Sequence, residues 1–445
     1  MKLSEIAPTL REIGVSPIKT LGQNFLHDRN LKQWIVDQAK IEREDFVVEI
    51  GPGLGALTEF ALAKGARVLA IEKDKRLADY LRARFPSPRL RVEHEDALKF
   101  DTRMLFTHPK VKLIGNLPYY VSSQLLLKFL EYPTAISLWL LMLQKELAKR
   151  LCAAPSTSDY GALTLIVQLH YRVEYLRSVP ASVFLPKPEV DSAIVRITPR
   201  DPSELAYCDH AVFEHLVRLG FSQRRKQLGK LIRKEVPDWE AAARELGFNA
   251  KARAEELSLR QWIALTNYVD RSDIAPERDQ PEEAFVVVDR ADRVTGTAPR
   301  EQVHANNLLH RAVHLLIFNQ AGEVLLQLRS RFKDRHPLRW DSSAAGHVSA
   351  GEEYDQTAMR ELSEELGIEA PLEKVAKLPA SEKTDHEFVC FYTGTHEGPF
   401  RANAREIESL GFFPVETVDG WIKARPQEFA PTFLECWKIC REKTR

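Results

Sequence analysis

The 445-residue sequence predicts an α/β protein with a Rossmann-like, doubly wound sheet, a small helical subdomain and a second, α+β domain. Three observations predict this class. In residues 1–202, short β-rich runs alternate with helical stretches. Residues 203–269 show no strand pattern. The polar stretch 270–282 contains two prolines and no periodic apolar residues, so it is expected to be a linker before a domain at 283–445.

The strands expected in the first region are rich in β-branched and apolar residues. They are Phe46–Ile50, Arg67–Glu72, Leu90–Glu93, Lys112–Ile114, Ser137–Leu143, Leu163–Tyr171 and Ala193–Ile197. Strands that alternate with helices form βαβ units, so a mostly parallel sheet is expected. After the linker, we expect strands at Ala284–Val288, Ala312–Phe318, Val324–Leu328 and Phe388–Thr393, and one strong helix at Tyr354–Leu366.

The charge of the chain is divided between its two halves. The totals are 63 Lys+Arg and 63 Asp+Glu, which cancel. Residues 1–270 hold 40 Lys+Arg against 33 Asp+Glu, and the rest of the chain holds 23 against 30. This asymmetry predicts two modules with different partners, although the net charge is zero.

Composition excludes several other classes of protein. No apolar run approaches the roughly 18 residues needed to span a bilayer, and the first residues lack an apolar signal region. Five scattered cysteines are too few for a disulfide framework or a zinc set. We therefore expect a cytoplasmic protein with no membrane partner.

A glycine-rich turn follows the first strand of the predicted sheet. The segment Glu49–Gly55 contains Gly51, Gly53 and Gly55 in a Gly-x-Gly-x-Gly pattern, which allows a close approach of a ligand to the backbone. Glu72 ends the next strand, where a carboxylate can accept hydrogen bonds from ribose hydroxyls. The glycine-rich turn and Glu72 suit a dinucleotide and S-adenosylmethionine about equally. The glycine spacing, and Asp96 after a third strand as a reader of the adenine amino group, favour S-adenosylmethionine.

The segment Asn116-Leu117-Pro118-Tyr119 follows the fourth strand and indicates chemistry on an exocyclic amine. Such an amine is a poor nucleophile because its lone pair is delocalised into the base. Asn116 and a backbone carbonyl at Pro118 can accept hydrogen bonds from its two N–H groups and orient the nitrogen, while Tyr119 can stack on a base that has left its helix. Asn-x-Pro is also common in turns, so the segment alone does not indicate a methyltransferase. Together with the glycine loop at the right distance, it favours one.

Residues 15–268 closely resemble the ribosomal RNA adenine dimethyltransferase family, in its small-subunit, 16S-type branch. The matching segments are Gly22–Leu26, Glu49–Gly55, Glu72, Asp96, Asn116–Tyr119, Phe184–Ser192 and Phe221–Leu228. The resemblance implies a class I methyltransferase that transfers two methyl groups to N6 of each of two adjacent adenosines near the 3′ end of 16S rRNA. It also implies an immature small ribosomal subunit as partner.

The resemblance also implies roles for individual residues. S-adenosylmethionine would be bound by Gln23, Asn24, Leu26, Gly51, Gly53, Glu72, Asp96 and Asn116. The target adenine would be oriented by Asn116, Pro118 and Tyr119, with Phe184 over its other face. A basic cluster expected on one helix face would contact RNA phosphates through Arg218, Arg224, Arg225, Lys226 and Lys230.

The second domain contains a complete Nudix box. Gly346, Glu352, Arg360, Glu361, Glu364, Glu365 and Gly367 stand at the required spacing. Because Glu361, Glu364 and Glu365 are related as i, i+3 and i+4, one helix face presents three carboxylates, which suit Mg²⁺ or Mn²⁺. The metal would bind a diphosphate and activate water. Glu352 and Arg360 are expected to orient the carboxylates, and Gly346 to permit a turn beside them.

Residues 283–440 resemble Nudix hydrolases, with similarity to the isopentenyl-diphosphate-isomerase-like branch in Leu309–His314, Leu326–Ser330 and Trp340–His347. Isomerases of that branch place a catalytic cysteine where this chain has Ala345. The resemblance therefore implies hydrolysis of a small diphosphate compound. His310, His314 and His347 are candidates for substrate contact or for structural roles.

The sequence thus predicts an rRNA adenine N6-dimethyltransferase fused to a metal-dependent Nudix hydrolase. Two alternatives stay open. One is a large-subunit rRNA adenine methyltransferase. The other is a ribosome-assembly binding factor whose Nudix module is not catalytic.

Overall fold

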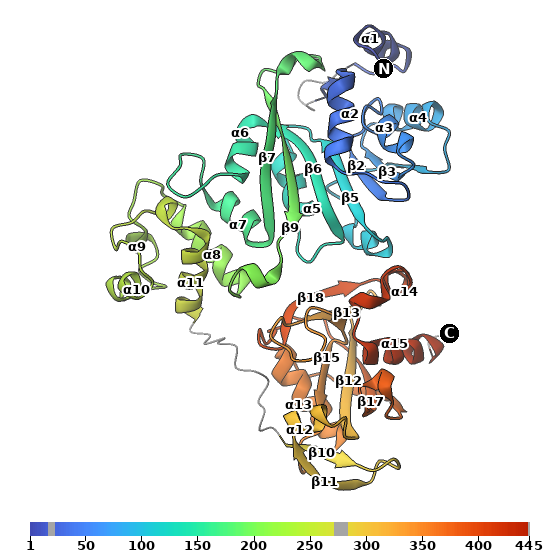
Figure 1. The fold of residues 1–445 in the computed structure, drawn as a ribbon, viewed down its shortest axis with the longest axis vertical. Helices are drawn as coiled ribbons and strands as arrows, with labels where there is room; N and C mark the ends of the chain where they lie inside the picture. The colour runs from blue at the N-terminus through green and yellow to red at the C-terminus, as the bar shows by residue number, and fades with distance from the viewer. Residues whose placement is uncertain (17–22, 271–283, 444–445) are drawn as a thin grey trace. The chain divides into compact units, whose positions relative to one another are not determined.

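The computed structural model describes residues 1–16, 23–270 and 284–443. The chain divides into two units, Met1–Ser272 and Asp273–Arg445, and each is described by itself (Figure 1). Of the expected linker 270–282, the structure describes only Asp270, the last residue of a helix. None of the helices in the described ranges combines the length and apolar character that a membrane crossing requires.

A seven-stranded sheet in the order β4-β3-β2-β5-β6-β9-β7 organises the first unit. Five neighbouring strands, β4 to β6, are parallel; β9 is antiparallel to β6, and β7 is antiparallel to β9. The strands are β2 (Phe46–Ile50), β3 (Arg67–Glu72), β4 (Leu90–His94), β5 (Val111–Asn116), β6 (Ile136–Gln144), β7 (Tyr171–Val179) and β9 (Ser192–Pro199). A small antiparallel pair joins β1 (Phe25–Leu26) to β8 (Phe184–Leu185). The predicted mostly parallel sheet is confirmed.

Helices pack against the sheet and bury its apolar strands. They are α2 (Arg29–Gln38), α3 (Thr58–Ala63), α4 (Lys75–Arg84), α5 (Ser122–Phe129), α6 (Lys145–Leu151) and α7 (Ala162–His170), whereas α1 (Leu3–Glu12) packs with Phe25, Leu54 and Leu77. One core cluster joins Val47 and Ile114 of the sheet to Ile35 of α2 and Leu81 of α4. Strands buried on both faces have near-continuous apolar sequences, and this explains why these strands could be recognised.

The register of the parallel strands brings their carboxyl ends to one edge of the sheet. Ile50 pairs with Ile71 on one side and with Gly115 on the other, and Glu72 pairs with His94. The segments that follow β2, β3, β4 and β5 therefore meet at this edge. Ligands of open α/β sheets bind in this position.

The expectation of a strand at Leu163–Tyr171 is wrong, because Tyr171 is the first residue of β7 and residues 163–170 lie in helix α7. Its buried positions are Thr164, Leu165 and Val167, and Leu165 joins the core of the helical subdomain. The Thr164 hydroxyl donates to the Arg150 carbonyl at 2.6 Å, which fixes the first turn against α6. A short apolar run has no clear period, so helix and strand cannot be distinguished without the neighbouring helices.

The helical subdomain is built on aromatic and aliphatic side chains. Its helices are α8 (His210–Gly220), α9 (Leu228–Leu231), α10 (Trp239–Glu245) and α11 (Leu259–Asp270). Phe213, Trp239 and Trp262 are buried in one cluster that also takes in Tyr160 and Leu165 from the sheet domain. No strand occurs in the described residues 203–269, as the sequence predicted.

The second unit is organised around β12 in a mixed nine-stranded sheet. β12 is parallel to β17 and antiparallel to β10, β13 and β15. The strands are β10 (Ala284–Val288), β11 (Val294–Pro299), β12 (His310–Phe318), β13 (Val324–Arg329), β14 (Trp340–Asp341), β15 (Ala344–His347), β16 (Leu372–Leu378), β17 (Glu387–Thr395) and β18 (Ile407–Phe413). The expected strands are all present, and β11, β14, β15, β16 and β18 are additional.

Helix α13 (Tyr354–Leu366) has the bounds that the sequence predicted. The preceding residue, Glu353, caps it, and the Glu353 N–H donates to the Gln356 side chain at 3.1 Å. Gly367 follows its last residue with a left-handed φ of 66°. Ala358 and Leu362 are buried against the sheet. The other helices are α12 (Arg300–Ala305), α14 (Val415–Ala424) and α15 (Pro431–Lys443).

Candidate functional site

A cavity of about 340 Å³ opens at the carboxyl edge of the first sheet. Its lining includes nine residues that the sequence singled out: Gln23, Asn24, Leu26, Gly51, Gly53, Glu72, Asp96, Asn116 and Pro118. They come from β1 and the segments after β2, β3, β4 and β5. The described part of the N-terminal motif begins at Gln23, so Gly22 lies outside the described residues. The fold thus brings the expected cofactor residues together in one cavity.

The glycine loop is held by Glu72. The Gly53 N–H donates to one carboxylate oxygen of Glu72 at 3.1 Å, and the Asp74 N–H donates to the other at 2.9 Å. Gly53 has a φ of +58°, and a Cβ on it would lie 3.1 Å from the ring of Phe25. Burial raises the pKa of Glu72, and the backbone N–H donors oppose that shift. The loop therefore has a shape that only glycine permits at Gly53.

Asp96 follows β4 and is charged at neutral pH. Its carboxylate lies 2.7 Å from the ammonium of Lys73 and accepts from the Leu98 N–H at 3.1 Å. The hydrogen bond from Lys73 lowers the pKa of Asp96. An ionised carboxylate accepts hydrogen bonds only, as expected of a group that reads an amino group.

The side chain of Asn116 is oriented by a contact with the N-terminal motif. Its amide nitrogen donates to the Asn24 carbonyl at 3.0 Å. This assigns Nδ2 to the donor side, so Oδ1 is left to accept. No described residue donates to Oδ1 within the criteria of a hydrogen bond. The arrangement leaves a free acceptor in the cavity at the end of β5.

Tyr119 and Phe184 do not line the cavity. The Tyr119 hydroxyl lies 2.6 Å from Oγ of Ser192, the first residue of β9, and burial raises the pKa of Tyr119. Phe184 is 3% exposed and packs in the core, with Leu26 as its β-partner. Stacking of a target base on Tyr119 and Phe184 stays a prediction, because this conformation does not display it.

Sequence reasoning missed several residues of this site. Ser192 was noted only as the end of a matched segment. Glu49 and Lys32 line the cavity and are buried. Burial raises the pKa of Glu49 to about 7, and the Thr58 hydroxyl donates to it at 2.6 Å. The sequence did contain a signal for Lys32, because it is a charged residue on the face of α2 that is otherwise apolar and buried.

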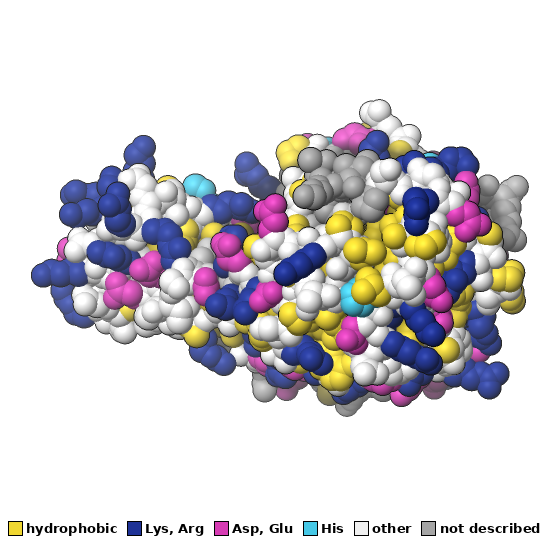
Figure 2. Space-filling model, turned by 90° about the horizontal axis from the view of Figure 1, so that it is seen from above, with side chains coloured by type: hydrophobic (Ala, Val, Ile, Leu, Met, Phe, Trp, Pro, Cys, Tyr) yellow, Lys and Arg dark blue, Asp and Glu magenta, His cyan; other side chains and the backbone are white. Residues whose placement is uncertain are grey.

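The basic residues lie around a turn, so the expectation that they share one helix face is wrong. α8 ends at Gly220, and residues 221–226 form a turn before α9. The ring of Phe221, the first residue after α8, lies 6.0 Å from that of Trp262 and packs, partly buried, against the core of the subdomain. Arg218, Arg224, Arg225, Lys226 and Lys230 are all exposed. Figure 2 shows Lys and Arg side chains gathered over this end of the first unit.

In the second unit, Arg360 holds the carboxylates of the Nudix box. Its guanidinium lies 2.9 Å from Glu352, 2.8 Å from Glu361 and 2.9 Å from Glu364. It also donates to the His347 carbonyl at 3.2 Å. Burial lowers the pKa of Arg360, and its acidic partners raise it. The net shift of this pKa is upward. Arg360 thus contacts Glu352 and two of the three box carboxylates, and its orienting role stays a prediction.

The three box carboxylates differ in their environment. Glu361 and Glu365 are buried, whereas the Glu364 side chain is 57% exposed. Burial raises the pKa of Glu361 to about 7 and raises the pKa of Glu365 well above its ordinary value. The Ala345 N–H donates to Glu365 at 3.1 Å. Buried carboxylates with raised pKa values are poised for a cation, which would restore their charge.

The cavity beside α13, of about 520 Å³, contains charged residues that the sequence did not reveal. Glu406, directly before β18, raises the pKa values of Glu361 and Glu365 by charge repulsion and forms an ion pair with Lys333. Arg329 pairs with Asp341 at 2.9 Å. A mixture of cations and carboxylates suits a phosphate substrate with its metal ion.

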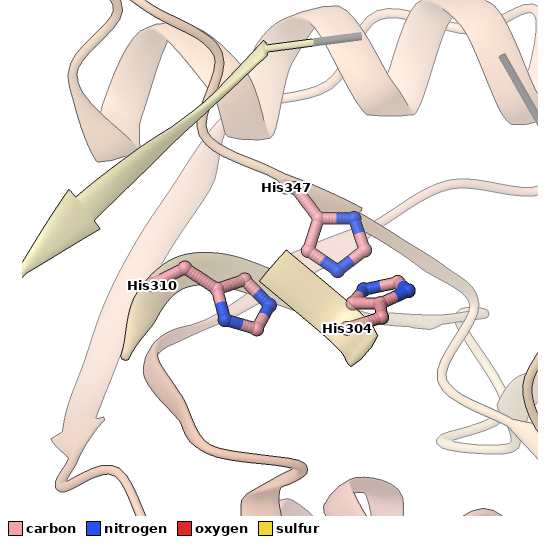
Figure 3. Close-up of side chains that lie close together, drawn as sticks. All are labelled: His304, His310 and His347. Carbon is pink, nitrogen blue, oxygen red and sulfur yellow. The ribbon is translucent and has the colours of Figure 1, made fainter. Parts of the chain in front are cut away.

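Three histidines of the second unit form a further group of donor atoms. One ligand nitrogen from each of His304, His310 and His347 lies within 4.8 Å of the others, and Figure 3 shows the three rings around a common space. Glu387 approaches His347 at 3.1 Å and His310 at 3.4 Å. Burial holds the pKa of His347 well below its ordinary value. Imidazole nitrogens so placed can hold a transition metal ion.

Of the three histidines noted in the sequence, His310 and His347 therefore belong to one cluster, and His314 does not. His314 has its Nδ1 2.9 Å from the Ser342 hydroxyl. His304 was missed, because it lies on α12, outside the segments that carry the resemblance.

Comparisons with known proteins divide the chain in the same way. The family model for ribosomal RNA adenine dimethylase matches residues 17–271, and that for the NUDIX domain matches residues 308–433. Ribosomal RNA small subunit methyltransferase A of Halothermothrix orenii is 38% identical over 270 residues, which are 58% of this chain and 90% of that protein.

Two solved structures are similar to the separate parts. A dimethyladenosine transferase from Plasmodium falciparum is 26% identical, with 56% of this chain and 98% of that chain covered and a TM-score of 0.48. Protein DR0079 from Deinococcus radiodurans is 25% identical, with 37% and 100% covered and a TM-score of 0.32.

Proposed function

The chain belongs to the ribosomal RNA adenine dimethylase family, and from this premise we propose that its first unit dimethylates N6 of two adjacent adenosines near the 3′ end of 16S rRNA. The methyl donor is S-adenosylmethionine, and the substrate is an immature small ribosomal subunit. The 38% identity to a small-subunit methyltransferase over nearly the whole of that relative supports this choice over a large-subunit enzyme.

One observation carries the proposal: the free acceptor on Asn116. Because Nδ2 is taken by the Asn24 carbonyl, Oδ1 can accept an N–H from the adenine amine. The Pro118 carbonyl accepts from the Val121 N–H at 3.2 Å and has a second lone pair for the other amine hydrogen. Two acceptors then hold the nitrogen with its lone pair toward the methyl donor.

The rest of the cavity suits S-adenosylmethionine, which supplies an electrophilic methyl group on a sulfonium. Glu72 accepts hydrogen bonds from the ribose hydroxyls, and Asp96 accepts from the adenine amino group of the cofactor. Glu49 also lines the cavity, and a cationic ligand beside it would favour the ionised form of its carboxyl group. The exposed basic residues around the α8–α9 turn contact RNA phosphates without reading sequence.

The test is transfer of labelled methyl groups to small subunits that lack this modification. We expect two methyl groups on each of two adjacent adenosines, and none on large subunits. Methylation of large-subunit RNA alone would support the resistance-type alternative. Binding to small subunits with no methyl transfer would support the assembly-factor alternative and overturn the proposal.

We also propose that the NUDIX domain hydrolyses a small diphosphate compound with Mg²⁺ or Mn²⁺. The observation that supports this is the set of Glu361, Glu364 and Glu365 on one face of α13, arranged by Arg360. The metal would supply Lewis acidity toward the diphosphate. Glu361 and Glu365 would ligate it, and the cations of the cavity would bind the phosphates.

A screen of diphosphate compounds with the full chain tests this second activity. Phosphate or nucleoside monophosphate release should require the metal and disappear with a chelator. Release that is equal with and without the metal would contradict the metal role. A chain that methylates RNA but cleaves none of the compounds would favour a non-catalytic NUDIX module.

A further inference from the structure

The methyl-donor cavity of the first unit is strongly acidic. Its lining includes Glu49, Glu59, Glu72, Asp74, Glu95 and Asp96. These carboxylates suit the sulfonium and the ammonium of S-adenosylmethionine. The same ligand has one carboxylate, on its methionine moiety, and an acidic cavity repels that group. A cation near the methionine carboxylate would offset this repulsion.

Two lysines line the cavity, and they differ in their partners. Lys73 is 61% exposed, and its ammonium lies 2.7 Å from Asp96. Lys32, on α2, is 3% exposed, and its ammonium donates to the Met1 carbonyl at 3.3 Å. No carboxylate oxygen of the described residues lies within 4.0 Å of the Lys32 ammonium. Lys32 is thus a buried cation with one neutral hydrogen-bond partner.

The ammonium of Lys32 has N–H donors that the described residues do not use. An ammonium has three N–H donors, and the structure uses one of them, with a long hydrogen bond. Burial lowers the pKa of Lys32, while the charges of Glu59 and Asp28 oppose that shift. Glu59 is itself 3.8 Å from Arg84. Burying a charge costs free energy unless a counter-charge is supplied, and a ligand carboxylate would supply it.

The position of Lys32 agrees with the methionine end of the ligand. Glu72 and Asp96, which follow β3 and β4, are taken by the ribose and the adenine of the cofactor. This leaves the part of the cavity formed by α2, the N-terminal motif and the residues before α3. Resting on the proposed methyltransferase function, we infer that Lys32 binds the methionine carboxylate of S-adenosylmethionine.

Two ligands that differ in one group test the inference. S-adenosylhomocysteine carries the carboxylate, and S-adenosyl-3-thiopropylamine keeps the nucleoside, thioether and amine but lacks it. In calorimetry with the full chain, Lys32→Met should weaken binding of the first ligand about 10- to 100-fold, as expected for a charge-assisted hydrogen bond, and leave the second within about 2-fold. Lys32→Gln provides a second variant if the methionine variant does not fold.

Lys73→Met is the matched control. It removes the other lysine of the cavity, which faces Asp96, so both ligands should respond to the same degree. Equal losses for both ligands in the Lys32 variants, or no loss, would overturn the role of Lys32 and leave the methyltransferase proposal intact. A wild-type chain that binds neither ligand would overturn the proposed function and this inference together.

Discussion

The amide nitrogen of Asn116 donates to the main-chain carbonyl of Asn24 at 3.0 Å, across 92 residues of sequence. This contact joins the N-terminal motif to the end of β5. It also decides that Nδ2 of Asn116 faces Asn24 and leaves Oδ1 to accept. The orientation of the amide is therefore a property of the fold, and the acceptor role that we propose for Asn116 depends on it.

We expect Asn116→Ala to lower the rate of methyl transfer by about 100-fold or more, because it removes an acceptor that positions the reacting amine. Affinity for the small subunit should stay within about 2-fold, since the basic residues around the α8–α9 turn are unchanged. Labelled-methyl incorporation and filter binding measure the two effects. Near-normal turnover would contradict the role given to Asn116.

Glu364→Gln and Glu365→Gln should each lower metal-dependent phosphate release by about 100-fold and leave methylation unchanged. Each substitution removes a charge that would face the metal ion. Glu373→Gln, which changes an exposed acidic residue on β16 outside the box, is the control. If methylation fell together with phosphate release, the two units would be coupled.

Gly346→Ala should disable the NUDIX site through a steric effect. A Cβ at this position would lie 2.0 Å from the Glu361 carboxyl group, so that side chain must leave its place. Metal-dependent hydrolysis should fall at least about 10-fold. Gly296→Ala, where a Cβ meets nothing within 4 Å, should leave the rate of hydrolysis unchanged. Equal rates for both variants would show that Glu361 has room to adjust.

The raised pKa of Glu49 makes the stability of the cofactor-free chain depend on pH. Burial raises its pKa from 4.5 to about 7 in the folded state. Between these values the folded state binds more protons than the unfolded state, so the free energy of unfolding falls as pH rises. Glu49→Gln keeps an acceptor for Thr58 and removes the ionisation. It should therefore stabilise the first unit at pH 8, by at most roughly 3 kcal/mol.

Urea unfolding followed by pulse proteolysis measures this effect, because the two units give separate fragments. The gain from Glu49→Gln should shrink as pH falls from 7 toward 4.5. Glu44→Gln is the control, since hydrogen bonding by Arg89 lowers the pKa of that exposed carboxyl, a shift opposite in sign to that of Glu49. A gain for Glu49→Gln that did not depend on pH would contradict the shift.

Several local features could be read from sequence because neighbouring residues determine them. The parallel strands β2 and β3 were found with the observed bounds, since strands buried on both faces are continuous apolar runs. Helix α13 was found because its period and its terminal Gly367 lie within one segment. The prediction of a strand at Leu163–Tyr171 was wrong because its structure depends on distant residues. Residues 163–170 form a helix that packs on α6 and α8.

The sequence by itself determined the motifs of both candidate sites: the glycine loop, Asn116–Tyr119 and the NUDIX box are short segments that their local spacing defines. Tertiary structure decided how the side chains of these sites are oriented and buried. It turned the amide of Asn116, placed Phe184 in the core, gathered His304, His310 and His347, and buried Lys32 in an acidic cavity. Burial and orientation depend on contacts between residues far apart in the chain, and a local pattern does not contain them.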